Sequence, residues 1–249
     1  MKAVITCAGK GTRLLPFTKE LPKEMAPIFS LGENGIEIKP LIQQIFENLF
    51  TIGIREFCFI SGKTKRSLQD HFYPDQQQDI PPSLSNFYEM IINSQIAWIN
   101  QLIPKGFGDA VLASKPFVNN DVFLVQAGDV VISSQVHSSI NKLIELSKND
   151  DIEAAFLVQT VTDPERHGIV TTEKDESISL VTKVVEKPKD PETNIGIMPF
   201  YFFRSSIFDA LGSTTPGYGN EIQLTDAIQK LIESGKNVAA IKMDKETIL

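Results

Sequence analysis

The sequence predicts an α/β protein with a doubly wound, mixed but mostly parallel sheet and helices on both of its faces. The first observation is that short apolar runs, typical of buried parallel strands, alternate with amphipathic stretches over the first half of the chain. The second is that hydrophobic residues make up 42% of the 249 residues, which is enough for a sizeable core. The third is that neither an internal repeat nor a low-complexity segment interrupts this pattern.

The first half reads as strands and helices in the order that parallel βαβ units require. Its clearest helix is Pro40–Thr51, with Pro40 in the first turn, Gly53 just past the end and the apolar residues on one face. The strands expected here are Ala3–Cys7, Glu56–Ile60, Gln95–Asn100 and Val122–Gln126; the other expected helices are Lys65–Phe72, Leu84–Asn93 and about Asp109–Lys115, with a polar loop over Gln76–Pro82.

The second half is less regular. The pattern predicts strands over Glu153–Thr160, Gly168–Thr172, Ser179–Val185, Ile195–Phe203 and Val238–Met243, and helices over about Ser205–Leu211 and Glu221–Ser234. In the last helix we expect Asn220 to act as the N-cap and Glu221 to place negative charge in the first turn. We expect Asp226 to be a packing or interface residue rather than a metal ligand.

Charge and cysteine usage narrow the class of protein. A formal net charge of −7 argues against a general nucleic-acid binder, although a local anion site remains compatible with it. No apolar stretch is long enough to span a membrane, and the N-terminus does not read as a secretory signal. Cys7 and Cys58 lie in apolar runs and are expected to be buried free thiols, which favours a cytoplasmic location. The histidines (His71, His137 and His167) lack the spacing of a zinc site.

Residues 8–25 carry the strongest functional signal, because Gly9 and Gly11 directly follow the first expected strand. Glycines there let backbone N–H groups approach a phosphate closely, and Arg13 and Lys23 supply positive charge. Two well-known phosphate loops do not fit: Val4 stands where a P-loop needs its first glycine, and Leu14 where a dinucleotide fingerprint needs its third.

From Gly9 to Lys23 the pattern is Gly-x-Gly-Thr-Arg-x-x-Pro-x-Thr-x-x-x-Pro-Lys. It resembles the signature of the sugar-1-phosphate nucleotidyltransferases, and Lys19, Glu24 and Met25 make it most similar to the UTP–glucose-1-phosphate uridylyltransferases among them. The resemblance implies a Rossmann-like fold of the nucleotide-diphospho-sugar transferase type. It implies conversion of UTP and glucose 1-phosphate to UDP-glucose and pyrophosphate with Mg²⁺. It also implies one domain, 1–249, with a nucleotide-binding lobe over about 1–130 and a sugar-phosphate-binding lobe over about 131–249.

The same resemblance assigns the nucleotide side of the site. Arg13 and Lys23 take the catalytic positions, and Asp129, at the end of an apolar strand, takes that of the Mg²⁺-binding aspartate. Gln101 and Gly106 take the positions that meet the pyrimidine, where an amide offers both a donor and an acceptor to the base edge. The nucleotide-binding residues expected in all are Ala8, Gly9, Gly11, Thr12, Gln101 and Gly106.

The sugar side is assigned from two shorter elements. His167-Gly168-Ile169-Val170 resembles the element whose glycine lets the backbone meet the sugar. Val185-Glu186-Lys187-Pro188 resembles the family's Val-Glu-Lys-Pro element, in which Glu186 would accept hydroxyl protons and Lys187 would neutralise the sugar phosphate. Asn194 corresponds to an asparagine close to the sugar.

The sequence departs from the family at its end, where a second metal-binding aspartate is expected in an Asp-x-Gly element. Three interpretations are open: the sequence lacks a native tail, Asp244 substitutes for this aspartate, or one carboxylate suffices together with the substrate phosphates. Because of this departure, the sequence does not decide the oligomeric state, and a homo-oligomer is one of the open alternatives. The rival interpretations are a glucose-1-phosphate thymidylyltransferase and a homologue that binds a sugar nucleotide without turnover; a dehydrogenase is disfavoured.

Overall fold

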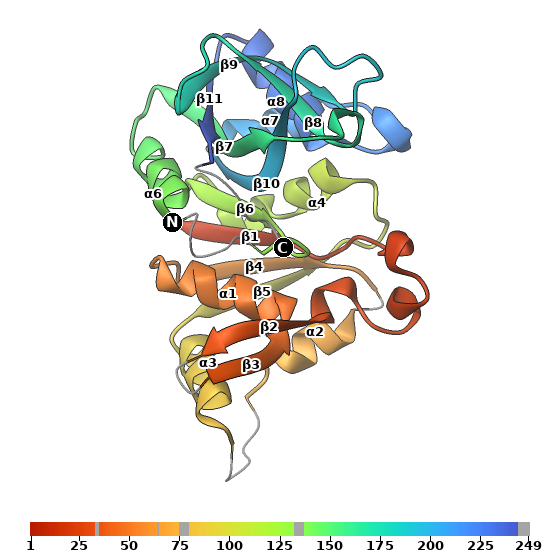
Figure 1. Ribbon diagram of the computed structural model, residues 1–249, viewed down its shortest axis with the longest axis vertical. Helices are drawn as coiled ribbons and strands as arrows, with labels where there is room; N and C mark the ends of the chain where they lie inside the picture. The colour runs from red at the N-terminus through yellow and green to blue at the C-terminus, as the bar shows by residue number, and fades with distance from the viewer. Residues whose placement is uncertain (33–34, 64, 75–79, 132–136, 244–249) are drawn as a thin grey trace.

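The computed structural model describes residues 1–32, 35–63, 65–74, 80–131 and 137–243 (Figure 1). Its centre is a nine-stranded sheet in the order β5-β4-β1-β6-β10-β7-β11-β9-β8. These strands are β1 (Lys2–Thr6), β4 (Glu56–Ser61), β5 (Gln95–Asn100), β6 (Phe123–Ala127), β7 (Ile152–Thr160), β8 (Gly168–Thr172), β9 (Ile178–Glu186), β10 (Ile195–Phe203) and β11 (Asn237–Lys242).

Helices cover both faces of this sheet, as the doubly wound pattern predicts. The helices are α1 (Leu41–Thr51), α2 (Arg66–His71), α3 (Pro82–Ile92), α4 (Phe107–Ala113), α5 (Lys115–Val118), α6 (His137–Leu146), α7 (Ser206–Gly212) and α8 (Leu224–Glu233). Side chains of α1, α2, α3 and α6 join one hydrophobic cluster, whereas those of α4, α5, α7 and α8 join a second. In β1, Ala3 and Ile5 belong to the first cluster and Val4 to the second, because successive side chains of a strand point to opposite faces.

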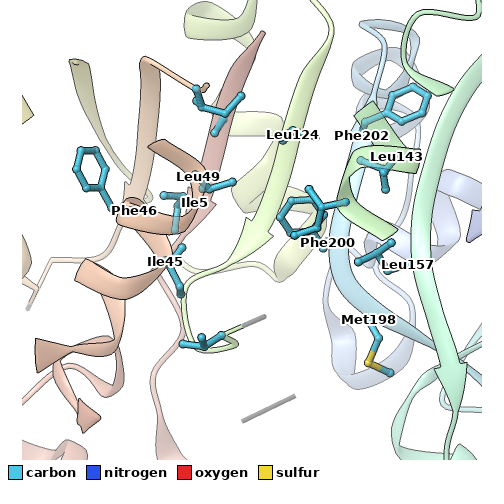
Figure 2. Packing of buried hydrophobic residues seen from close by; sticks show 14 of the residues in the cluster. Ile5, Ile45, Phe46, Leu49, Leu124, Leu143, Leu157, Met198, Phe200 and Phe202 are labelled. Atoms are coloured by element: carbon cyan, nitrogen blue, oxygen red, sulfur yellow. The ribbon is translucent and has the colours of Figure 1, made fainter. Parts of the chain in front are cut away.

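The first cluster is shown in Figure 2, where Ile45, Phe46 and Leu49 of α1 approach the sheet beside Ile5. Farther along the same face, Leu143 of α6 lies near Leu157 and Phe200. Both parts belong to one set of buried residues that extends from β4 and β1 across to β7 and β11. One apolar layer therefore connects the two halves of the sequence.

The sheet is mixed, as predicted, but its parallel part is smaller than the mostly parallel sheet that we expected. Parallel pairing is confined to β5–β4–β1–β6 and to β7–β11. β10 runs antiparallel to β6, β7 and β8, and β9 runs antiparallel to β8 and β11. The physical reason is that β7 to β10 follow one another through connections too short for the crossovers that parallel strands need.

Three further differences concern individual elements. Residues 27–40 form a hairpin outside the main sheet, β2 (Pro27–Gly32) paired with β3 (Gly35–Pro40), and α6 follows β6; neither was predicted. The last helix was predicted to begin at Glu221 with an Asn220 cap, which is wrong. It begins at Leu224, and Asn220 lies in a short 3₁₀ turn with a φ of 59°. Residues 222 and 223 are held instead against another part of the chain, as described below.

The other predicted helices and strands are confirmed to within a few residues, with the helix near Asp109–Lys115 divided into α4 and α5. Part of the loop expected over Gln76–Pro82 lies outside the described residues, and its end, Pro82, already belongs to α3. Cys7 and Cys58 are buried free thiols, as expected. None of the helices that the structure describes is both long and apolar enough to cross a membrane.

Candidate active site

The site residues from the first half gather where the order of the strands reverses. β1 pairs with β4 on one side and with β6 on the other, so the chain leaves the carboxyl ends of β1 and β6 next to each other. The Gly128 N–H donates to the Thr6 carbonyl at 3.0 Å, which holds the two ends together. In open α/β sheets this reversal creates a crevice that commonly binds ligands.

Lys23 and Asp129 meet at this point although they are 106 residues apart in the sequence. The Lys23 Nζ lies 2.6 Å from the Asp129 Oδ2, and both side chains are partly exposed. Lys23 begins a short 3₁₀ helix, Lys23–Met25, whereas Asp129 directly follows Gly128. The structure thus brings the predicted catalytic lysine and the predicted metal ligand into direct contact.

The glycine turn lies beside this pair. A Cβ atom at Gly9 would lie 3.2 Å from the Lys23 Nζ, so any other residue there would displace the lysine slightly. Gly11 has a φ of 66°, a conformation that glycine adopts without penalty. The Thr18 hydroxyl donates to the Gly11 carbonyl at 2.7 Å and closes the turn from the other side.

Arg13 and Thr12 follow Gly11 in a 3₁₀ helix, Thr12–Leu14, and both are exposed. No hydrogen bond or ion pair of the Arg13 side chain occurs within the described part of the chain. Ala8, by contrast, is buried at the base of the turn. The turn therefore presents its backbone and the Arg13 guanidinium to solvent.

A buried ion pair lies beneath Lys23. The Lys65 Nζ contacts the two Glu24 carboxylate oxygens at 2.7 and 2.8 Å, and Glu24 is fully buried. Burial raises the pKa of Glu24, and Lys65 opposes that rise. A side chain on Gly128 would clash with the Cys7 sulfur at 2.6 Å, and burial followed by the Glu24 charge raises the pKa of that thiol. These groups fix the backbone that carries Lys23 and Asp129.

Gln101 directly follows β5 and is buried. Its Nε2 donates to the Asp109 carboxylate and, at 3.5 Å, to the Gly106 carbonyl, and its backbone N–H donates to the Ser61 carbonyl at 2.8 Å. Among the described residues we find no hydrogen bond to its Oε1. Only the acceptor of this amide is left for a ligand, rather than the donor and acceptor that we expected.

The turn around Gly106 contacts the second half of the chain. A side chain at Gly106, whose φ is 119°, would meet the Ile222 carbonyl oxygen at 2.6 Å. The Gly108 N–H donates to that same carbonyl at 2.9 Å, and the Ile222 N–H donates to the Lys105 carbonyl at 2.7 Å. These two bonds hold residues 222 and 223 in an extended conformation and explain why α8 begins only at Leu224.

The residues predicted for the sugar form a second cluster at the end of β9. The Lys187 Nζ lies 2.8 Å from the Glu186 Oε1, and Thr225 donates to the Glu186 Oε2 at 3.1 Å. A side chain at Gly168 would meet Thr225 at 2.7 Å and Glu186 at 3.3 Å. The Lys187 Nζ also lies 4.9 Å from the centre of the exposed Tyr218 ring.

Asn194 directly precedes β10, and Asp226 lies in α8 next to Thr225. Asn194 is exposed, and its carbonyl accepts the Val161 N–H at 2.9 Å. Asp226 is packed under Gly217, where a side chain would reach its Oδ2 at 2.4 Å. Burial, followed by the Glu186 charge, raises the pKa of Asp226. The packing role expected for Asp226 agrees with this position.

Asp129 is the one predicted metal ligand in the described part of the chain. Within the described residues there is no group of three or more His, Cys, Asp or Glu side chains that could hold a metal ion. Asp129 nevertheless suits Mg²⁺, which takes one or two protein carboxylates and completes its coordination with phosphate oxygens and water. Asp244 lies outside the described residues.

A doubly wound sheet with a glycine turn, a lysine and a carboxylate at its switch point defines a protein built for phosphorylated nucleotides. The chain belongs to the nucleotidyl transferase family, whose model matches residues 2–247, and is therefore a nucleotidyltransferase. The UTP–glucose-1-phosphate uridylyltransferase of Staphylococcus epidermidis is 36% identical to it over 244 residues, covering 92% of this chain and 81% of the relative.

Two further comparisons agree with this relationship. The enzyme of the same name from Streptococcus pneumoniae is 35% identical over 248 residues, covering 92% of this chain and 79% of the relative. A crystal structure of UDP-glucose pyrophosphorylase complexed with UDP-glucose matches with a TM-score of 0.86 at 28% identity, covering 98% of this chain and 91% of that one. The nucleotide-diphospho-sugar transferase type of fold is thereby confirmed.

Sequence reasoning missed the residues that support the site. Lys65 gave no signal, because a lone lysine in a polar stretch usually remains in solvent. The contacts of Thr225 and Tyr218 were not predicted either, although Thr225 lies in a run, Asn220 to Ile228, that resembles the uridylyltransferase family. Their partners Glu24, Glu186 and Lys187 come from distant parts of the chain, and only the fold brings them together.

Proposed function

We propose that this chain transfers a uridylyl group from UTP to glucose 1-phosphate and releases pyrophosphate. The observation that carries the proposal is the convergence of the glycine turn, Lys23 and Asp129 at the reversal of strand order. Support also comes from relatives that bear the name of this activity and are 35–36% identical over about four fifths of their length. A structural neighbour was solved with UDP-glucose, the product of this reaction.

In the proposed reaction an oxygen of the sugar phosphate attacks the α-phosphorus of UTP. The new P–O bond forms as the bond to the bridging oxygen breaks, and pyrophosphate leaves with that electron pair. No protein nucleophile is needed, so catalysis rests on positioning two anions and on stabilising charge at the α-phosphate. Arg13, Lys23 and Lys187 are the protein cations available for this task.

On the nucleotide side, backbone N–H groups of Ala8, Gly9, Gly11 and Thr12 would hold the phosphates. The Gln101 Oε1 would accept the N3–H of uracil, since the Asp109 carboxylate and the Gly106 carbonyl accept from its Nε2. A cytosine ring has an acceptor at N3 and would be rejected there. Gly106 would let the base approach the turn that rests on Ile222.

On the sugar side, Glu186 would accept hydroxyl protons and Lys187 would bind the sugar phosphate. Thr225 fixes the Glu186 carboxylate, and the ring of Tyr218 lies beside the Lys187 ammonium. Gly168 and Asn194 would meet the sugar from the neighbouring strand ends. In this assignment residues of about 1–130 bind the nucleotide and residues of about 131–249 bind the sugar phosphate.

Asp129 would hold Mg²⁺, which supplies positive charge to the phosphate oxygens when bound. The ion pair with Lys23 would then open, because the lysine is needed on a phosphate. The metal requirement follows from the chemistry of two polyanions that must be brought together. A cytoplasmic location is proposed from the two free thiols, which suit a reducing compartment.

The proposal is tested by measuring pyrophosphate release with Mg²⁺, glucose 1-phosphate and each of UTP, dTTP, CTP, ATP and GTP. We expect release with UTP to exceed that with every other nucleotide. Selective release with dTTP would make the protein a thymidylyltransferase. A folded sample that binds UDP-glucose but releases no pyrophosphate would make it a non-catalytic homologue.

A further inference from the structure

The hairpin β2–β3 has its apolar face turned to solvent. Four large side chains lie on that face, in the cross-strand pairs Phe29–Ile38 and Leu31–Ile36. Their exposed fractions are 77% for Phe29, 67% for Ile38, 88% for Leu31 and 76% for Ile36. A surface strand normally buries such residues and exposes its polar ones, so this hairpin has the reverse arrangement.

The polar face of the hairpin is the one that contacts the rest of the molecule. The Ser30 hydroxyl donates to Gln44 of α1 at 2.6 Å, and the Lys39 Nζ contacts Glu47 of α1 at 2.8 Å. Lys39 also contacts Glu37 across the same face at 3.5 Å. These bonds fix which face is outward, since turning the hairpin over would break them. The exposed apolar face is therefore held in place by the fold.

Such a face is large for a surface that stays in water. Large apolar side chains carry on the order of 150–200 Å² each, so the four expose roughly 500 Å² together. Contiguous apolar patches of that size are among the largest on soluble proteins and often mark an interaction site. Two such faces in contact would bury about 1,000 Å² in total, which reaches the lower limit of specific protein interfaces.

We propose that the apolar face of the β2–β3 hairpin binds the same face of a second copy of this chain across a two-fold axis. A two-fold axis requires a surface that complements itself, and two flat cross-strand pairs without charges satisfy that requirement. The chain carries a net charge of −7, yet within the two described strands the charged side chains, Glu37 and Lys39, lie on the α1 side, so neither strand brings a charge into the contact. This inference does not depend on the proposed function.

The test is the molar mass of the full chain in solution, measured by light scattering and sedimentation over about 1–100 µM. We expect the wild-type chain to have at least twice the mass of one chain. Leu31→Lys places a charge in the contact and should halve that mass, with a dissociation constant at least about a hundredfold higher. The matched control is Leu102→Lys, the same change at a residue that is 86% exposed but lies after β5, and it should leave the mass unchanged.

Both substitutions are at exposed positions, so the far-UV circular dichroism of each variant should match the wild type and show that the chain is folded. A wild-type chain that remains a monomer up to 100 µM overturns the proposal. A Leu31→Lys variant with the full wild-type mass also overturns it, because another surface then holds the assembly. A loss of mass in Leu102→Lys equal to that in Leu31→Lys assigns the effect to added charge and overturns it as well.

Discussion

Lys23 and Asp129 form an ion pair in which the Lys23 Nζ lies 2.6 Å from the Asp129 Oδ2. The contact pairs two charges in a partly buried site. Leaving either ion there without a partner would be costly. In the proposed reaction the lysine would bind a phosphate, and the Asp129 carboxylate would hold Mg²⁺. Since the lysine is available to the transition state only after this exchange, its removal should affect turnover far more than folding.

We expect Lys23→Ala to lower kcat by about a hundredfold or more, on the scale of one lost electrostatic donor. Steady-state kinetics with UTP and glucose 1-phosphate measure this, and circular dichroism checks the fold. Lys148→Ala is the matched control, because Lys148 is an exposed lysine paired only with Glu145 among the described residues. Near-normal turnover in Lys23→Ala would remove this residue from the mechanism.

Gln101 is expected to decide the base rather than the rate. Its Nε2 is held by Asp109, so its Oε1 is fixed where an acceptor distinguishes the N3–H of uracil from the bare N3 of cytosine. Gln101→Ala should reduce the preference for UTP over CTP more than it reduces kcat with UTP. Competition assays with both nucleotides measure the ratio, and an unchanged UTP/dTTP/CTP ratio would count against this role.

At the scale of elements, the turn before α4 and the start of this helix are packed closely against residues 222 and 223. Gly108 lies inside α4, where alanine normally stabilises a helix by about 0.5–1 kcal/mol. Here a side chain would meet the Ile222 carbonyl oxygen at 2.8 Å and Leu211 at 2.9 Å. Helix propensity alone predicts that alanine at this position stabilises the protein, whereas these close contacts predict that it destabilises it.

Gly108→Ala should lower the free energy of unfolding by about 1–3 kcal/mol, the usual cost of overpacking. Urea unfolding measures it. Gly212→Ala in α7 is the matched control, since no heavy atom lies within 4 Å of a side chain there, and it should be neutral or slightly stabilising. Equal effects of the two substitutions would mean that the contact with Ile222 contributes little.

At the scale of the whole molecule, both hydrophobic clusters contain residues from both halves of the sequence. Ile5 and Phe46 share one cluster with Leu157 and Phe200, and Val111 shares the other with Phe208. The sheet also runs without interruption from β5 to β8. Neither half can bury its apolar residues without the other.

We therefore expect a single cooperative unfolding transition. Fluorescence of Trp98, the one tryptophan of the chain, reports on β5 in the first half, and far-UV circular dichroism reports on all helices and strands. The two probes should give the same urea midpoint. Two separated midpoints would instead mean that the proposed nucleotide and sugar lobes fold independently.

The local pattern of apolar and polar residues was sufficient to predict most of the helices and strands. Apolar runs and their spacing predict β1, β4, β5 and α1 to within a residue or so, because each buries a contiguous set of side chains against one face. They do not predict the hairpin β2–β3, whose apolar face is outward, or the late start of α8. In both cases contacts with distant residues, α1 and Lys105–Gly108, determine the local structure.

The sequence by itself determined the doubly wound class, the glycine turn and the positions that resemble a nucleotidyltransferase, because these depend on residue type and short spacing. The tertiary structure alone decided that Lys23 contacts Asp129, that Lys65 is buried on Glu24, and that Thr225 fixes Glu186. It also decided how much of the sheet is parallel. The physical reason is that these features join residues far apart in the chain, and only packing determines which distant groups meet.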